Sequence, residues 1–508
     1  MFEFIDNFLN QITMYKLILY YLIILLVLAG LFGQFGILPY SPLALLFSVL
    51  VLTAACLAAN KIFSVVVKVQ TNVESAYITA LILALIITPL QITHLYSTLP
   101  FLLWAAVWAM ASKYILAIKH KHVFNPAAFA VALTALTIGQ SASWWVGTSS
   151  MFIFVLIGGF LVIRKIQRQT MVYSFLGAAL ITSLVLSFNR TNPASLLYNA
   201  AIVSPLIFFA AVMLTEPLTT PPKKYGQIAY GILIGILFLP QIHFGNFYLT
   251  PELALIAGNL FSYAISPKGR YTLKLLAKEK ASEGVYNFVF LPDKKVQFQP
   301  GQYLEWTLGH KRTDSRGNRR YFTIASSPTE NEVILGVRFY DKPSSFKSKM
   351  LALNPGDTIM ASQLAGDFTL PKDPNKKLVF IAGGIGITPF RSMLKYLIDK
   401  NEKRAVTTIY SSNSMDEIAY YDILEQAAEK IGAETIFTLT NQTKIDPRWQ
   451  GYRGYVSAKM ITEQIPDYKD RYFYISGPHT MVSACENVLS GLGVSKFQIK
   501  TDFFPGLV

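Results

Sequence analysis

Long apolar stretches separated by short polar connections dominate the first half of the chain. A membrane-spanning helix needs about 20 consecutive apolar residues, and runs near that length occur at ten places: 17–35, 38–59, 75–92, 99–118, 125–139, 150–164, 171–188, 195–215, 226–242 and 249–265. The fifth and sixth runs are short, which favours broken or tilted helices covered by other parts of the protein. The pattern predicts a polytopic α-helical membrane domain of about ten helices over residues 1–265.

The pattern changes to short alternating segments beyond this point. Between Tyr271 and Gln363, apolar and polar residues alternate in six segments separated by turns, which predicts an antiparallel β-barrel over residues 266–370. After Pro371, buried strand-like segments such as KLVFIAGG alternate with helical ones such as TPFRSMLKYLIDK. Residues 371–508 are therefore expected to form a doubly wound α/β domain with a parallel sheet.

Charge separates the same two halves and predicts their orientation. Residues 1–265 contain 12 Lys/Arg and 5 Asp/Glu, against 33 and 25 in residues 266–508. This contrast excludes a disordered chain and a purely cytosolic enzyme. Connections after the odd-numbered runs carry one basic residue, Arg190. Connections after the even-numbered runs carry all the others: Lys61, Lys68, Lys119, Lys121, Arg164, Lys165, Arg168, Lys223, Lys224, Lys268 and Arg270. By the positive-inside rule, we expect a multi-pass protein of the cell's inner membrane with its N-terminus and its whole second half in the cytoplasm.

The cysteines, the histidines and the net charge of the chain limit which electron carriers and partners can be expected. Cys56 and Cys485 are the two cysteines of the chain, too few for an iron–sulfur cluster, which needs about four thiolates. Histidines in the first half stand at loops or segment ends, an arrangement that does not favour a bis-histidine haem, and no metal site is expected. The net charge of +15 is shared between the halves, so nucleic acid is not an expected partner.

Two motifs in the predicted barrel could hold a phosphorylated ring cofactor. In Arg320-Tyr321-Phe322-Thr323, an arginine can pair with phosphate, an aromatic side chain can cover a flavin ring, and a hydroxyl can reach its N5 region. Residues 320 and 322 would share one strand face. Ser345 and Lys347 in PSSFKSKM could bind pyrophosphate at a helix start. An aromatic strand with a surface arginine and an ordinary capped helix are the alternatives.

A glycine-rich turn and a second turn mark the carboxyl edge of the predicted parallel sheet. Gly384, Gly386 and Thr388 lie between a buried strand and a helix, where backbone can approach a pyrophosphate. Gly477 and Pro478 follow Ser476 at the end of the strand RYFYI. Ligands gather at this edge of such sheets.

The order of these motifs resembles that of the ferredoxin–NADP reductase family: PGQY, RYFT, SSFK, GDF, GGIGITP, SGP and a terminal TDFFPGL. The resemblance implies a FAD-binding barrel and a NAD(P)-binding domain, with hydride passing from nicotinamide to flavin. It implies that Arg320, Tyr321, Phe322, Thr323, Ser345 and Lys347 serve FAD, that Gly384, Gly386, Thr388, Gly477 and Pro478 serve NAD(P)H, and that Thr323 and Ser476 flank the hydride path. Many relatives have cysteine where Ser476 stands. Tyr410-Ser411-Ser412-Asn413 contains no arginine for a 2′-phosphate, which favours NADH over NADPH.

The membrane half carries a second resemblance. Its segments SAYITALILALIITP, KHVFNPAAF and FFAAVMLTEPLTTPPKKYGQIAYGILIGIL resemble the D subunit of Rnf-type complexes and the B subunit of the sodium-pumping NADH:quinone reductase. This implies FMN and redox-linked ion transport. Thr148, Asn125 and Glu216 are the candidate membrane flavin site, although the family's Ser-Gly-Ala-Thr motif is missing around Thr148, so a covalent bond is not expected there. Asn125-Pro126 and Glu216-Pro217 each adjoin a similar apolar helix, which suggests an internal repeat.

Together these features predict a membrane-bound flavoprotein oxidoreductase. Electrons would pass from cytoplasmic NAD(P)H through FAD to a quinone, a flavin or a redox protein in or across the lipid bilayer. The alternative is a subunit of a larger Rnf-like electron-transport complex in which the redox step drives Na⁺ or H⁺ movement. A third reading, in which the membrane half only anchors a reductase of soluble partners, is less favoured because one span would suffice.

Overall fold

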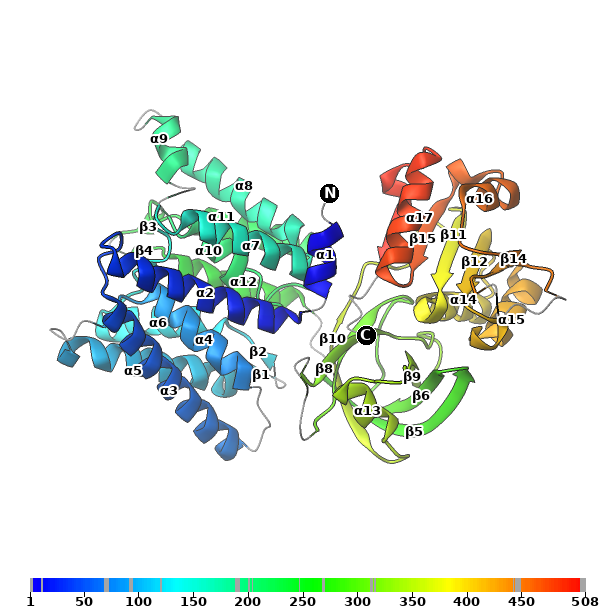
Figure 1. Ribbon diagram of the computed structural model, residues 1–508, viewed down its shortest axis with the longest axis horizontal. Helices are drawn as coiled ribbons and strands as arrows, with labels where there is room; N and C mark the ends of the chain where they lie inside the picture. Colours follow the sequence, from blue (N-terminus) through cyan, green and yellow to red (C-terminus); the bar gives the residue numbers. More distant parts are fainter. Residues whose placement is uncertain are drawn as a thin grey trace. The chain divides into compact units, whose positions relative to one another are not determined.

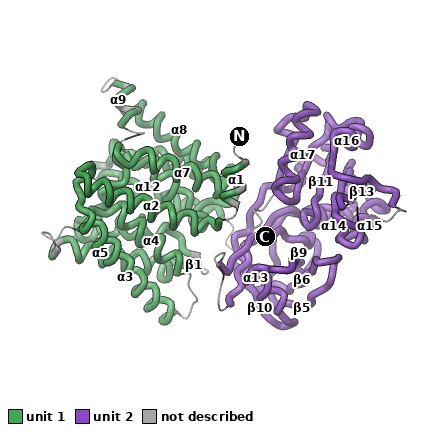
Figure 2. Tube along the Cα trace, in the orientation of Figure 1, with its two compact units in different colours: residues 1–268 green, residues 269–508 purple. Residues whose placement is uncertain are grey.

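The computed structural model describes residues 3–10, 12–67, 73–90, 95–118, 121–187, 192–199, 202, 204–245, 247–266, 270–310, 314, 317–441, 443 and 449–502. The chain divides into two compact units, Met1–Lys268 and Gly269–Val508 (Figure 2). The first unit is built mainly from helices, and the second contains two β-sheets with helices (Figure 1).

Apolar helices form most of the first unit. They are α1 (Glu3–Asn10), α2 (Met14–Gln34), α3 (Pro42–Val67), α4 (Val73–Ile86), α5 (Leu95–Ile115), α6 (Pro126–Ile138), α7 (Phe152–Ile166), α8 (Gln169–Leu186), α9 (Pro193–Tyr198), α10 (Leu206–Phe208), the π-helix η3 (Phe209–Met213), α11 (Lys224–Leu237) and α12 (Pro251–Ile265). Two short hairpins accompany them, β1 (Ala117–Ile118) with β2 (Lys121–His122) and β3 (His243–Phe244) with β4 (Phe247–Tyr248).

Four of the described helices are long and apolar enough to cross a membrane, namely Met14–Gln34, Pro42–Val67, Thr98–Ile115 and Gln169–Leu186. The predicted run 195–215 is not one continuous helix, because it contains α9, α10 and η3. Pro205 caps α10, and a proline has no N–H to continue a helix ladder. An arrangement of ten spans stays a prediction.

Local sequence sets the starts of α6 and α12 in the same way. Asn125 caps α6 by accepting from the Ala128 N–H, and Pro126 opens the helix. Thr250 caps α12 by accepting from the Leu253 N–H, and Pro251 opens it. Proline suits this position because its missing N–H would have no helical partner.

The packing of the first unit repeats itself. In the first set of helices, α2 packs on α4, α3 on α5, and α5 on α6. In the second, α7 packs on η3, α8 on α11, and α11 on α12. Contacts of α2 with α7 and of α6 with α12 join corresponding members of the two sets. This arrangement supports the suggested internal repeat.

The first sheet of the second unit is antiparallel and curled (Figure 1). Its order is β8-β7-β10-β5-β6-β9, and the helix α13 (Ser345–Leu351) accompanies it. The strands are β5 (Arg270–Ser282), β6 (Val285–Pro292), β7 (Tyr303–Thr307), β8 (Arg319–Thr323), β9 (Val333–Arg338) and β10 (Thr358–Ala365). All six overlap the predicted strands, whereas closure into a barrel stays a prediction.

The second sheet is parallel, as predicted. Its order is β14-β13-β12-β11-β15-β16, so the direction of strand addition reverses between β11 and β15. The strands are β11 (Leu378–Gly383), β12 (Val406–Ser412), β13 (Glu434–Leu439), β14 (Tyr452–Arg453), β15 (Tyr472–Ser476) and β16 (Ile499–Asp502). The helices that accompany them are α14 (Thr388–Asp399), α15 (Tyr421–Ile431), α16 (Ala458–Gln464) and α17 (His479–Gly491).

Polar contacts link the two sheets of the second unit through the start of α14. Arg391 pairs with Glu330 through both terminal guanidinium nitrogens and donates to the Ala325 carbonyl oxygen at 3.0 Å. Ser392 Oγ donates to the Ser326 carbonyl oxygen at 2.6 Å. Because Arg391 is only 8% exposed, water does little to weaken this ion pair.

Candidate functional site

Two glycine turns meet at the point where the parallel sheet reverses its order. After β11, the chain makes the 3-10 turn η4 (Gly384–Ile387) and enters α14. A Cβ atom added to Gly386 would lie 2.3 Å from the Ser476 carbonyl oxygen and 2.7 Å from the Gly477 nitrogen. One added to Gly383 would lie 3.2 Å from Cδ of Pro478. The structure therefore brings Gly386 against the backbone of Ser476 and Gly477, and Gly383, next to Gly384, against Pro478 and the Met481 sulfur, which would lie 2.1 Å from a Cβ on Gly383.

This geometry fits a dinucleotide. The reversal point of a doubly wound sheet is where such ligands bind, and glycine turns leave room for pyrophosphate beside a helix start. Gly384 has φ +53°, a left-handed conformation that favours glycine. Thr388 sits at the first turn of α14, but its hydroxyl donates to the Ile385 carbonyl oxygen at 3.1 Å. In this structure Thr388 therefore stabilises the turn itself.

Arg338, which sequence reasoning missed, lies beside the same turn. Its Nη1 is 3.4 Å from the position of a Cβ on Gly384, and its Nη2 is 2.6 Å from Glu417 Oε2. In the sequence it is one arginine at the end of an apolar strand, LGVRFY, which cannot be told from a surface arginine.

Arg320 and Phe322 lie on one face of β8. The Arg320 guanidinium carbon is 5.3 Å from the centre of the Phe346 ring, and the rings of Phe322 and Phe346 are 6.1 Å apart. Tyr321 points to the other face, where its hydroxyl donates to Glu305 at 2.9 Å. The structure thus groups Arg320 with Phe322 and α13 but does not bring Tyr321 to them, because successive strand residues alternate in direction.

The expected phosphate ligands Arg320 and Ser345 both contact Asp314. The Ser345 N–H donates to Asp314 Oδ2 at 2.9 Å, and Ser345 Oγ accepts from the Asp314 N–H at 2.9 Å. Arg320 Nη2 lies 3.9 Å from Asp314 Oδ1. The hydrogen-bond donors of Arg320 and Ser345 therefore suit an anion, since the Asp314 carboxylate already lies among them. A phosphate would compete with this carboxylate for the same donors. Lys347 is directed elsewhere, because its Nζ donates to the Arg338 carbonyl oxygen at 2.9 Å.

The remaining motifs fall at strand ends. Thr323 and Ser476, the expected flanks of the hydride path, are buried at the ends of β8 and β15. Ser476 on β15 pairs in register with Asp502 on β16, and burial raises the pKa of the Asp502 carboxyl to about 7.

The PGQY and GDF turns contact each other, since a Cβ on Gly301 would lie 2.1 Å from the Phe368 carbonyl oxygen. The terminal aromatic stretch after Asp502 lies outside the described residues.

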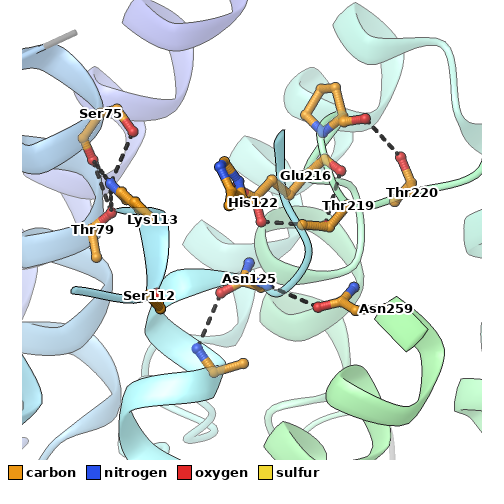
Figure 3. Close-up of polar contacts among 12 residues, drawn as sticks. Ser75, Thr79, Ser112, Lys113, His122, Asn125, Glu216, Thr219, Thr220 and Asn259 are labelled. Atoms are coloured by element: carbon orange, nitrogen blue, oxygen red, sulfur yellow. Dashed lines mark hydrogen bonds and ion pairs between the residues drawn. The ribbon is translucent and has the colours of Figure 1, made fainter. Parts of the chain in front are cut away.

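Figure 3 shows a polar cluster in the first unit, around Asn125 and Glu216. The Asn125 N–H donates to Asn259 Oδ1 at 2.8 Å, and Asn125 Nδ2 lies 3.5 Å from the carbonyl oxygen of Met213, the last residue of η3. His122 Nε2 is 3.1 Å from Glu216 Oε1. The end of η3 and the start of α6 thus bring the two predicted residues into one neighbourhood.

A half-buried lysine lies in the same view (Figure 3). Lys113 Nζ donates to the Ser75 carbonyl oxygen at 3.1 Å, to Ser75 Oγ at 3.0 Å and to Thr79 Oγ1 at 2.9 Å. An ammonium has three N–H donors, and these three oxygens of α4 match them. Ionisable groups inside membrane proteins usually mark functional sites.

Thr148 does not join this cluster. Asn125 caps the start of α6, whereas Thr148 follows its other end, and a helix of 13 residues is about 20 Å long. The predicted membrane flavin residues are therefore divided between two places. Near Thr148, Trp144 Nε1 donates to Glu252 at 3.1 Å and Trp145 Nε1 to the carbonyl oxygens of Ala84 and Ile87 at 3.0 Å.

Comparison with known proteins distinguishes the same two parts. Residues 104–268 match the model of the NQR2, RnfD, RnfE family, and residues 380–487 match that of the oxidoreductase NAD-binding domain. The first match lies in the first unit and the second match in the second unit, so the two units resemble different families. Both resemblances seen in the sequence are confirmed for these domains.

Individual relatives match part of the chain. The glycine betaine monooxygenase reductase subunit of Pseudomonas aeruginosa is 28% identical over 229 residues, covering 44% of this chain and 62% of the relative. The flavohemoprotein of Oceanobacillus iheyensis is 27% identical over 245 residues, covering 46% and 59%. The chain thus spans about three fifths of the length of these relatives. The FAD/NAD-binding domain of Vibrio cholerae nitric oxide dioxygenase is 22% identical, with a TM-score of 0.41 over 46% of this chain and 98% of that one.

Proposed function

We propose that the protein is a membrane-bound flavoprotein oxidoreductase. It takes electrons from NAD(P)H, passes them through FAD, and delivers them to a quinone or flavin in or across the membrane. The observation that carries the proposal is the direct contact between the turns at Gly386 and Gly477, at the ligand-binding edge of an oxidoreductase NAD-binding domain.

The second unit would hold both soluble cofactors. Gly384, Gly386, Gly477 and Pro478 would border the nicotinamide dinucleotide. Arg320 and Ser345 would bind the FAD phosphates in place of Asp314, and Phe322 would cover the ring. When bound, FAD accepts a hydride and can release its electrons singly. Thr323 and Ser476 would border the hydride path with short hydroxyl side chains, whereas Lys347 would have to leave the Arg338 carbonyl oxygen to reach a phosphate.

The first unit would hold the acceptor. Asn125 and Glu216, with His122 and Lys113 nearby, supply hydrogen-bond donors, acceptors and a positive charge that suit the headgroup of a quinone or the ring of FMN. Thr148 would belong to a separate flavin position if one is present. In this proposal about ten spans cross the cell's inner membrane, and the second unit lies in the cytoplasm.

Redox-driven transport of Na⁺ or H⁺ within a larger complex is the second candidate. It is favoured by the match to the NQR2, RnfD, RnfE family and by the repeated packing of the helices. Glu252, which is 1% exposed, and Glu216 are acidic groups that a transported cation could contact.

Both candidate functions, electron transfer and redox-driven ion transport, can be tested by analysing the bound cofactors and by measuring turnover. The full chain purified in detergent should release FAD on acid precipitation, and NADH should bleach its flavin absorbance near 450 nm under anaerobic conditions. A colourless protein that leaves NADH unoxidised with ferricyanide would refute the proposal. Proteoliposomes given NADH and quinone, with a Na⁺ or pH dye inside, separate electron transfer from ion transport.

A further inference from the structure

Glu417 contacts Arg338, which borders the glycine turn, and the proposed function gives neither residue a role. It ends the 3-10 helix η5 (Met415–Glu417), which follows β12. Its Oε2 accepts from Arg338 Nη2 at 2.6 Å and from Asn413 Nδ2 at 3.1 Å. Since the Arg338 and Glu417 side chains are only 18% and 12% exposed, this charge is largely shielded from water.

The position of Asn413 shows which part of a dinucleotide would meet this carboxylate. Asn413 directly follows β12, the strand hydrogen-bonded to β11 and hence next to the glycine turn. Its side chain is held in place, because Oδ1 accepts from Thr440 Oγ1 at 3.1 Å while Nδ2 donates to Glu417. In doubly wound nucleotide-binding sheets, the adenosine ribose is read at the carboxyl end of this neighbouring strand.

We infer that the Glu417 carboxylate selects nucleotides that carry a free 2′-hydroxyl, so that NADH is used in preference to NADPH. This inference rests on the proposed oxidation of NAD(P)H and names the specificity of that site. Glu417 acts in two ways. Its charge opposes a 2′-phosphate, and it engages Arg338, a cation that a 2′-phosphate could otherwise attract.

The size of the effect follows from the charges. A phosphate monoester carries about −1.5 to −2 charges at neutral pH. Repulsion by one carboxylate at the edge of a site with partial access to water should amount to about a five- to tenfold preference. Salt screens such interactions, so the preference should shrink as ionic strength rises.

The test is the substitution Glu417→Gln, which removes the charge and keeps an oxygen that can accept from Asn413. The full chain in detergent is assayed with NADH and with NADPH, using ferricyanide as acceptor. We expect kcat/KM for NADPH to rise about five- to tenfold, with that for NADH changing less than about twofold. The matched control is Asp416→Asn, which removes an exposed charge one residue away and should leave the ratio unchanged.

Equilibrium binding of NAD⁺ and NADP⁺ to the same proteins separates this inference from the proposed function. If neither nucleotide is oxidised but Glu417→Gln tightens NADP⁺ binding selectively, the proposed activity fails and the role of Glu417 stands. A binding ratio that stays within about twofold of the wild-type value overturns the inference, as does an equal shift in Asp416→Asn.

Discussion

Replacing Gly386 with alanine tests the contact between the two glycine turns. The new Cβ would lie 2.3 Å from the Ser476 carbonyl oxygen and 2.6 Å from its carbonyl carbon, whereas ordinary contacts begin near 3.4 Å. Both neighbours are backbone atoms, so no side chain can rotate away, and one turn must move by about 1 Å. Overpacking of this kind costs about 1–3 kcal/mol.

The displaced residues are those that would border the nicotinamide. If the full cost falls on the nucleotide complex, kcat/KM for NADH should drop by roughly 5- to 150-fold. The protein should remain folded, because a domain has about 5–15 kcal/mol of stability. Steady-state kinetics with ferricyanide, together with circular dichroism melting, measures both effects.

Gly491→Ala provides the matched control. Gly491 ends α17, and a Cβ there would meet nothing within 4 Å. Its kcat/KM should stay within about twofold of the wild type, since only helix propensity changes. The reasoning is refuted if Gly386→Ala retains wild-type kcat/KM for NADH, or if Gly491→Ala loses as much.

Three further substitutions address the flavin site, the sheet edge and the membrane cluster. Asp314→Asn removes a carboxylate that competes with phosphate at Ser345, so FAD should bind about tenfold more tightly in fluorescence titrations of the apoprotein; weaker binding would contradict this. The carboxyl of Asp502 has a folded-state pKa of about 7 against an ordinary 3.8, so it should destabilise the fold progressively as pH rises from about 4 to about 7, by at most about 4 kcal/mol. Asp502→Asn should abolish this pH dependence of stability, which hydrogen exchange of peptides from β15 and β16 can measure at each pH. Equal protection from exchange in the wild type and the variant at both pH 5 and pH 8 would contradict this prediction. Lys113→Met should slow NADH:quinone turnover by roughly tenfold or more while ferricyanide reduction stays unchanged, because only the half-buried charge at the proposed acceptor site is lost; an equal loss in both assays would place its effect outside that site.

The sequence predicted those features that depend on local pattern. Alternation located the strands from β5 to β10, and the order of a buried strand, three glycines and a helix located the turn before α14. Each signal lies within about 15 residues and reflects a local requirement, either the period of a strand or the space needed beside a backbone turn.

Features that depend on distant contacts could not be predicted. Arg338 and Glu417 are 79 residues apart in sequence, and Asp314 and Ser345 are 31 apart. Neither pair has a pattern that differs from ordinary surface charges. The separation of Thr148 from Asn125 depends on the length of α6 and on which helix ends meet. Tyr321 shows the converse, because adjacency in sequence placed it with Phe322 while strand geometry turned it away.

The ion pair between Arg391 and Glu330 limits how the two sheets of the second unit can move during turnover. Arg391 is the fourth residue of α14, so the helix that starts at the glycine turn is fastened to the chain that leaves β8. A hinge at this junction would have to break a shielded ion pair along with the bond from Ser392. In the proposed function, the two sheets of the second unit should therefore keep a fixed spacing, so that the distance between NAD(P)H and FAD is set before the nucleotide binds. Regulation of the turnover rate would then act on nucleotide binding and product release. Crosslinking the antiparallel sheet to the parallel sheet of the second unit should leave turnover largely intact.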